Sequence, residues 1–219
     1  MRSSQAVAES RPRVTGLGLI RASGLAALAA GIIFAGIQPI HPPDTLASVT
    51  TRAWAVITPL KTAMCMLFLL GIGGLYARQV DQAGWLGLAG FLLLSLSWTL
   101  QTAFVFAEAF VLPPLATLDP NFVDGVLGIA SGRDSELNLG ALPPLYAVVG
   151  VTYIVGGLVF GIATWGAGIL SRRAAGLLAV AAALTPVAAV VPHQVGRLAA
   201  VPTAVAVAWL GYGLWSERR

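Results

Sequence analysis

Long apolar runs separated by short polar stretches are the main pattern along the chain. They occupy residues 15–40, 53–76, 84–112, 145–170, 174–191 and 198–215. A helix needs about 20 apolar residues to cross a bilayer, and the first four runs exceed that length. The last two are shorter, and each contains a proline (Pro186 or Pro202), which indicates a tilted or broken geometry. The pattern predicts an all-α fold, in which residues 1–219 form one bundle of six membrane-spanning helices.

Composition supports this class and excludes others. Of the 219 residues, 57% are hydrophobic and only 10% are charged, whereas a soluble domain carries about 25% charged residues. The net charge is +4, but the basic residues flank the apolar runs instead of gathering on one face. They therefore indicate topology, and no nucleic-acid partner is expected. The lone Cys65 lies inside an apolar run and is expected to be a packing residue.

The basic residues also predict an orientation. Nine arginines fall on one side of the six-span topology and three on the other. The nine are Arg2, Arg11, Arg13, Arg21, Arg78, Arg172, Arg173, Arg218 and Arg219, and the three are Arg52, Arg133 and Arg197. The positive-inside rule then places both termini in the cytoplasm and the connection 113–144 outside. The run 15–40 is expected to be a retained helix, because residues 38–41 offer no small-x-small cleavage site.

Two connections carry helix signals of their own. In the external connection, Phe122, Val126 and Ile129 recur at helical spacing after Asp119, which indicates a short helix on the membrane surface. A disordered loop is the alternative there. Before the second run, Asp44 follows two prolines and is predicted to cap a helix that continues into that run.

Two ionisable residues fall clearly inside the apolar runs. Lys61 lies about two turns into the second run and Glu108 about one turn before the end of the third. Consecutive spans are antiparallel, so the two charges lie at similar depth. We predict that they pair, because a buried unpaired charge is costly. The alternative is that both side chains extend to the headgroups without forming a pocket.

Other polar residues share the outer half of the predicted bundle. Gln101, Tyr146 and Tyr153 map there together with Lys61 and Glu108, while the inner halves are mostly Gly, Ala, Leu and Val. This gradient suggests a hydrated cavity between the helices, and these five residues are the candidate ligand-binding residues. No catalytic residue is predicted.

Histidines and glycines give weaker signals. His41 and His193 both fall at outer helix ends, and facing histidines can hold haem or a metal, but both lie beside prolines and no ligand-spaced cluster supports such a site. No cofactor or metal is predicted, with haem as the alternative. Gly157 and Gly161 form a GxxxG face that either packs inside the bundle or forms a homodimer.

Five segments carry a resemblance: HPPDTLASVT (residues 41–50), GLYARQ (74–79), GWLGLAG (84–90), FAEAF (106–110) and AWLGY (208–212). They resemble segments of a family of bacterial multi-pass membrane proteins that has no assigned activity. The resemblance covers most of the chain. It implies a location in the bacterial inner membrane and no catalytic residues.

Three classes of function remain open. The leading hypothesis is binding or transport of a small amphiphilic or lipid-like ligand through the polar cavity, with membrane lipids as partners. The second is an accessory or structural subunit of a membrane complex, because glycine-rich faces occur without a catalytic signature. The third is a membrane-embedded redox protein or other enzyme, which would use His41, His193, Lys61 and Glu108.

Overall fold

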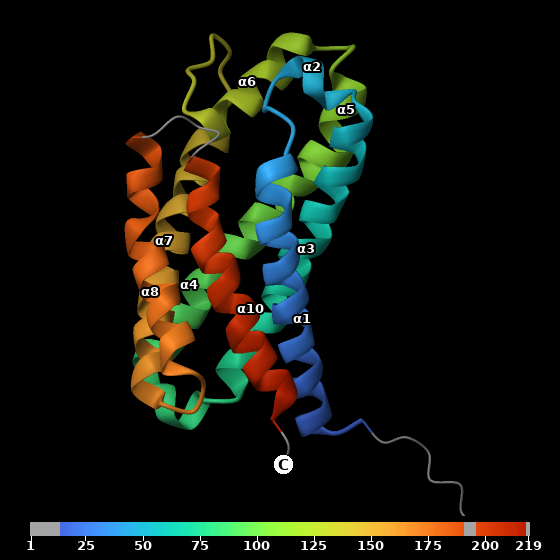
Figure 1. Cartoon of the computed structure of the whole chain (residues 1–219). Helices are drawn as coiled ribbons and strands as arrows, with labels where there is room; N and C mark the ends of the chain where they lie inside the picture. Colours follow the sequence, from blue (N-terminus) through green and yellow to red (C-terminus); the bar gives the residue numbers. More distant parts are fainter. Residues whose placement is uncertain (1–13, 191–195, 218–219) are drawn as a thin grey trace, which may run out of the picture.

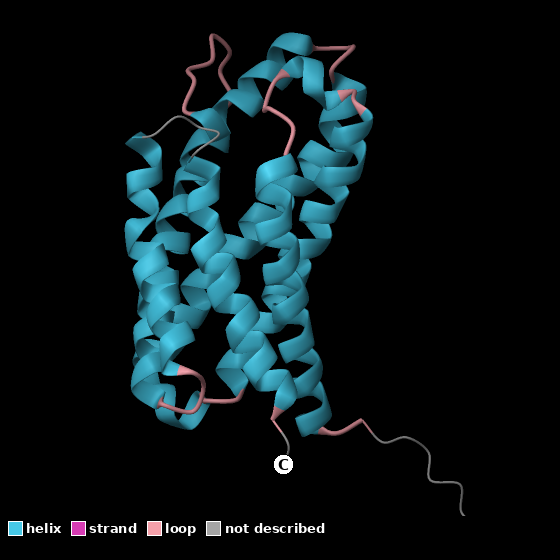
Figure 2. Cartoon of the chain, in the orientation of Figure 1, coloured by secondary structure: helices cyan, strands magenta, loops and turns pink. Residues whose placement is uncertain are grey.

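Helices make up the computed structural model, which describes residues 14–190 and 196–217, without the side chains of residues 188–190. The long helices are α1 (Gly16–Ile37), α3 (Arg52–Ala77), α4 (Val80–Phe106), α7 (Leu142–Ala167), α8 (Arg172–Leu184) and α10 (Ala200–Ser216). Short segments join them: η1 (Gln38–Ile40), α2 (Leu46–Val49), η2 (Ala107–Val111), α5 (Leu112–Leu115), α6 (Pro120–Ser131), η3 (Thr185–Val190) and η4 (Arg197–Ala199). The described residues contain no strand (Figure 2), which agrees with the predicted all-α class.

The long helices stand side by side in a ring. In order around it, α1 is followed by α3, α4, α7, α8 and α10, and α10 packs back against α1. Figure 1 shows that α1 begins and α10 ends at one end of the bundle, while α2, α5 and α6 lie together at the other end. We call the latter the α6 end.

Glycines bring neighbouring helices into backbone contact. A Cβ atom at Gly31 would lie 2.4 Å from the carbonyl oxygen of Ala204, and one at Gly211 would lie 2.5 Å from the backbone nitrogen of Leu28. No side chain fits in such a space, so α1 and α10 approach as closely as small residues allow.

The GxxxG face of α7 also packs inside the bundle. A Cβ atom at Gly161 would lie 2.7 Å from the backbone nitrogen of Ala179, and one at Gly157 would lie 2.9 Å from the Cβ of Ala182. Both neighbours belong to α8. The structure therefore contains the internal packing of the GxxxG face, which was one of the two alternatives beside a homodimer.

Five helical stretches of the described chain are long and apolar enough to cross a membrane. They are Gly16–Ile40, Arg52–Ala77, Val80–Leu115, Leu142–Ala167 and Arg197–Ser216. They overlap five of the six predicted spans. The remaining one, 174–191, is not confirmed, because α8 has only 13 residues and the chain continues from Thr185 as the 3₁₀ helix η3. Pro186 lies at this change of geometry and has no N–H for an α-helical bond.

The outer surface of the bundle fits a membrane-embedded protein. Large apolar side chains point away from the core along its helices, including Leu17, Ile32, Leu70 and Val151, and Trp85 is 86% exposed. Soluble proteins rarely expose so much contiguous apolar surface.

A backbone break within α4 marks the start of the third predicted span. Gly84 has φ +57° and ψ −157°, a conformation that side chains with a Cβ atom disfavour. Residues 80–83 therefore form a separate turn. The uninterrupted helix starts beside residue 84, where the hydropathy pattern places the span.

The short helix predicted in the long connection is present as α6. The Asp119 carboxylate accepts a hydrogen bond from the backbone N–H of Phe122 at 3.0 Å, which caps the first turn. Val123 and Leu127 are buried and pack into a small apolar cluster with Trp54 of α3. The helix thus covers the α6 end of the bundle, as Figure 1 shows.

The prediction that Asp44 caps a continuous helix is wrong. Helix α2 begins after Thr45 and spans only one turn, and a separate helix α3 begins after Thr51. The hydroxyl of Thr51 caps α3 by accepting a hydrogen bond from the backbone N–H of Trp54 at 3.3 Å. The carboxylate of Asp44 instead forms an ion pair with Arg197.

Candidate functional site

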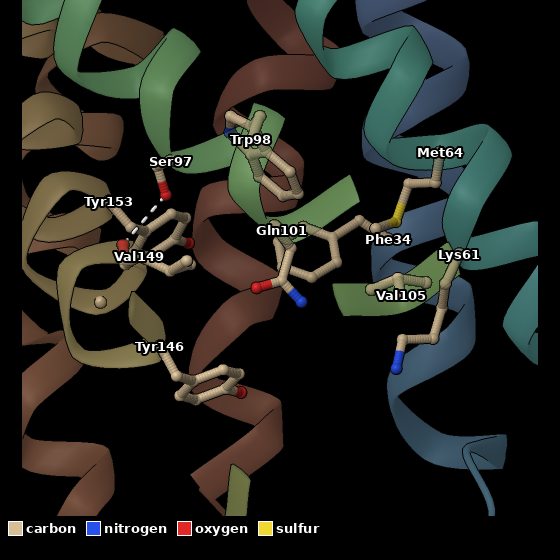
Figure 3. A pocket seen from close by; sticks show the side chains of 11 residues that line it. Phe34, Lys61, Met64, Ser97, Trp98, Gln101, Val105, Tyr146, Val149 and Tyr153 are labelled. Carbon is tan, nitrogen blue, oxygen red and sulfur yellow. Dashed lines mark hydrogen bonds between the residues drawn. The ribbon is translucent and has the colours of Figure 1, made fainter. Parts of the chain in front are cut away.

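A cavity of about 240 Å³ lies between α1, α3, α4 and α7, and we call it the chamber. Apolar and aromatic side chains form most of its wall. It is lined by Phe34, Met64, Trp98, Val105, Val149 and Gly150 and by the more polar Lys61, Ser97, Gln101, Tyr146 and Tyr153 (Figure 3).

Stacked aromatic rings make one side of the chamber rigid. The ring of Trp98 stacks on that of Phe68, with centroids 3.9 Å apart and planes 7° from parallel. Phe34 and Tyr153 meet Trp98 edge-on, at centroid distances of 5.7 Å and 6.1 Å. Both arrangements are favourable for aromatic rings. The chamber therefore offers an apolar surface that is already in place.

A second cavity of about 190 Å³ adjoins the chamber towards the α6 end, and we call it the vestibule. It shares five lining residues with the chamber, which are Phe34, Lys61, Met64, Gln101 and Tyr146. Its other lining residues include His41, Asp44, Glu108 and Arg197, so its wall carries charged groups beside apolar ones. The two cavities thus adjoin, with a sharp change of polarity between them.

A wide outer recess continues the vestibule at the α6 end. The recess measures about 670 Å³ and shares Gln38, His41, Asp44 and Arg197 with the vestibule. Arg133 lines the recess further out, where it pairs with Asp124 at 3.2 Å. The vestibule therefore adjoins this recess on one side and the chamber on the other.

Lys61 and Glu108 form the ion pair that the sequence predicts. The Lys61 Nζ donates to Glu108 Oε2 at 2.7 Å, and the side chains are 16% and 15% exposed. Both line the vestibule. The alternative, in which both side chains extend separately to the headgroups, is wrong for this structure, because each charge is turned inward to the other.

A local change of helix geometry presents Glu108 to Lys61. Residues 107–111 form a π-helix, η2, which is wider than an α-helix and is frequent at functional sites. The indole N–H of Trp54 donates to the Glu108 backbone carbonyl at 2.9 Å. Because Trp54 is fully buried, this bond ties η2 to the start of α3. Trp54 is therefore a positioning residue for the Glu108 carboxylate.

The second ion pair of the vestibule joins segments that are far apart in the sequence. Arg197 at the start of η4 donates to the Asp44 carboxylate in the loop after η1. Both side chains are mostly buried. With Lys61 and Glu108, the described part of the vestibule wall then holds two cations and two anions.

Burial and charge keep His41 neutral beside these pairs. Burial, together with the positive charges of Lys61 and Arg197, lowers the pKa of His41 to about 4. The His41 Nδ1 lies 2.6 Å from the Pro42 carbonyl oxygen, which only accepts, so Nδ1 carries the proton. For Asp44, burial acts to raise the pKa, but the positive charges around it, with that of Arg197 the largest, and the hydrogen bond from Arg197 together outweigh burial, so the pKa lies below its usual value. Among the lining residues that the structure describes, two cations, two anions and a neutral imidazole thus balance in charge.

The five predicted site residues lie around the same space. Lys61, Gln101, Tyr146 and Tyr153 line the chamber, and Glu108 lines the vestibule with Lys61, Gln101 and Tyr146. In Figure 3 the polar ends of Lys61, Gln101 and Tyr146 point into one central volume. Their role in binding a ligand stays a prediction.

Sequence reasoning missed the apolar wall and the second ion pair. Helical spacing from the polar residues could have found part of the wall, because Trp98 and Val105 stand three positions before and four after Gln101 on one face of α4. Nothing in the sequence pairs Asp44 with Arg197, which stands 153 positions away.

No metal site is seen among the residues that the structure describes. They contain no group of three or more His, Cys, Asp or Glu side chains that could hold a metal ion. Of the two histidines considered for haem, His41 contacts the edge of Trp54 and its own loop. His193 lies outside the described residues. Cys65 is buried in the core, in accordance with a packing role.

Comparison with known proteins finds no matching family model, curated protein or solved structure. The family resemblance of the sequence stays an expectation. What the chain does is therefore argued from the geometry of the chamber and vestibule.

Proposed function

We propose that the protein binds a small amphiphilic molecule whose apolar part lies in the chamber and whose polar end lies in the vestibule. The change of lining between the two adjoining cavities carries this proposal. Aromatic and aliphatic side chains surround one end and two ion pairs the other. Mostly apolar pockets with a few well-placed polar groups are typical small-molecule sites.

The region beyond the chamber is tightly packed in this conformation. Beyond the chamber, away from the α6 end, packing among Phe68, Leu94 and Phe160 leaves only about 10 Å³. This supports binding from the α6 end. Transport across the membrane would require this packed region to open.

We further propose six crossings of a bacterial cell membrane, with the α6 end outside. Helix α8 is about 20 Å long and η3 adds about 12 Å, so that together they match the roughly 30 Å of hydrocarbon. Helices α1 and α10 share one end (Figure 1), as an even number of crossings requires. The excess of arginine near that end supports a cytoplasmic location for it, and the family resemblance supports the bacterial inner membrane.

Labelling of introduced cysteines tests the orientation. In a Cys65→Ala background, Asp124→Cys on α6 is expected to react with a membrane-impermeant maleimide in intact cells. Ser171→Cys, at the start of α8 and the other end of the bundle, should react only after the membrane is opened. The reverse pattern would place the α6 end in the cytoplasm.

Quenching of Trp98 fluorescence tests binding. A single-chain amphiphile that carries bromine atoms in its chain should quench Trp98 saturably in nanodiscs, and the Trp98→Phe variant reports the background of the other tryptophans. The chamber can be filled by Gly150→Leu, where an added Cβ meets nothing within 4 Å. Gly166→Leu on the same helix, which is equally unhindered and does not line the chamber, is the matched control. Binding that is lost in Gly150→Leu alone supports the proposal, and equal quenching in both variants contradicts it.

A further inference from the structure

The charges of the vestibule are already compensated within the protein. Lys61 holds the Glu108 carboxylate at 2.7 Å, and Arg197 holds that of Asp44. His41 lies beside them as a neutral imidazole, because burial lowers its pKa to about 4. Among the described residues, a ligand therefore meets polar groups whose charges cancel.

Hydrogen-bonding capacity nevertheless remains at the boundary between chamber and vestibule. The Lys61 ammonium has three N–H groups, and Glu108 takes one of them. The amide of Gln101 and the hydroxyl of Tyr146 make no hydrogen bond with any residue in the described part of the chain. Figure 3 shows these two groups and the Lys61 amine around one space. They supply both donors and acceptors at one depth.

We propose that this site takes an uncharged single-chain amphiphile, with a hydroxyl, carbonyl or amide head at Lys61, Gln101 and Tyr146. This inference rests on the proposed function and names the class of its ligand. An uncharged head bonds to the spare groups while both ion pairs stay intact. A carboxylate or phosphate head would compete with Glu108 for Lys61, and a cationic head would compete with Lys61 for Glu108. Either competition leaves a mostly buried protein charge without its partner.

The dimensions of the site favour a small ligand with one chain. The chamber measures about 240 Å³ and the vestibule about 190 Å³. Each volume lies below the range of about 300–1,000 Å³ for small-molecule pockets, and only the two adjoining cavities together reach its lower end. The apolar part of the ligand lies against Phe34, Met64 and Trp98, in a chamber whose volume suits one chain.

Three probes with the same brominated chain distinguish the head classes. One ends in a neutral glycerol ester, one in a carboxylate and one in a trimethylammonium group, and all are measured at pH 8 in nanodiscs of uncharged lipid. The measured signal is the quenching of tryptophan fluorescence in the native protein minus that in the Trp98→Phe variant. It is plotted against the mole fraction of the probe in the bilayer. We expect the neutral probe to bind about tenfold or more tightly than either charged probe.

The outcomes separate this inference from the proposed function. If the carboxylate or the trimethylammonium probe binds as tightly as the neutral one, the head class is wrong, although the amphiphile site stands. If none of the three quenches Trp98 saturably, the proposed function fails as well.

A charge variant gives a second readout. Glu108→Gln leaves Lys61 without its carboxylate, so it should raise the affinity of the carboxylate probe about tenfold relative to the neutral probe. The matched control is Glu217→Gln, because Glu217 pairs with Arg78 at 2.8 Å at the opposite end of the bundle. A shift of the same size in both variants would show a bulk charge effect and would overturn the inference. If Glu108→Gln does not fold, the comparison of the three probes in the native protein decides.

Discussion

Removing one member of the Lys61–Glu108 pair is expected to destabilise the bundle at least as much as removing both. The two groups are 2.7 Å apart and about one-sixth exposed, so a surviving partner would be a charge largely removed from water. Breaking a buried pair typically costs about 3–5 kcal/mol. We expect about 2–3 kcal/mol for Lys61→Met or Glu108→Leu, because the adjoining vestibule can admit water. The double variant has no unpaired charge and should lose no more than either single variant.

Thermal unfolding in mild detergent measures this coupling. In a chain of this size each kcal/mol corresponds to about 2–4 °C, so the single variants should unfold about 4–12 °C lower. The coupling energy of the cycle should be about 2–3 kcal/mol. Arg133 and Asp124 provide the control cycle, since their side chains are each 47% exposed and exposed pairs couple by about 1 kcal/mol or less. Additive losses in the Lys61–Glu108 cycle would refute the reasoning that the pair is buried.

Three further predictions concern stability. The pKa of His41 falls from 6.5 in the unfolded chain to about 4 in the fold, so the unfolded state binds more protons between those pH values. The free energy of unfolding should therefore fall by about 1–3 kcal/mol as the pH drops from 6.5 to 4. The His41→Gln variant should lose less stability over this range, and parallel pH profiles of the two proteins would contradict the lowered pKa. Trp54→Phe removes the indole bond to the π-helical carbonyl and should lower the unfolding free energy by about 1–3 kcal/mol, whereas Trp85→Phe on the exposed surface should have little effect. Gly31→Ala should destabilise the protein by about 2 kcal/mol or more, because its Cβ would lie 2.4 Å from a carbonyl oxygen of α10. In the control Gly36→Ala the added Cβ meets nothing within 4 Å, and this variant should be more stable by about 0.5–1 kcal/mol. Changes of the same sign in detergent unfolding would argue against the close contact of α1 with α10.

Hydropathy predicts most of the bundle because the bilayer imposes a length on every crossing. The limits of α1, α3 and α7 follow from their apolar runs to within a few residues. The run 174–191 is equally apolar, but hydropathy does not register a change from α-helix to 3₁₀ helix, and Pro186 gives only a hint of it. Hydropathy thus predicted the positions of the apolar segments well and their local helix geometry poorly.

The charged pair inside the spans was predictable, whereas the shape of the site was not. Lys61 and Glu108 stand out because ionisable groups are rare in apolar runs and need a partner there. The π-helix at Glu108 lies directly before Pro113 and Pro114, which hint at irregular geometry, but its bond to Trp54 comes from another helix and cannot be seen in the local sequence. The pairing of Asp44 with Arg197 depends on the ring order of the helices, which periodicity does not reveal.

The contact between α1 and α10 has a consequence for how the protein is made. Ala27 and Ala30 of α1 are fully buried in the finished bundle, and Gly31 is covered by the backbone of α10. Yet α10 leaves the ribosome roughly 160 residues after α1, which takes about 10–30 s at 5–20 residues per second. During that time α3 can already cover Ala27, which packs against Gly71, but the part of the face around Gly31 has only lipid or the insertion machinery beside it. A nascent chain that stalls before residue 200 would keep this face open, which gives membrane quality control a feature by which to recognise an unfinished copy.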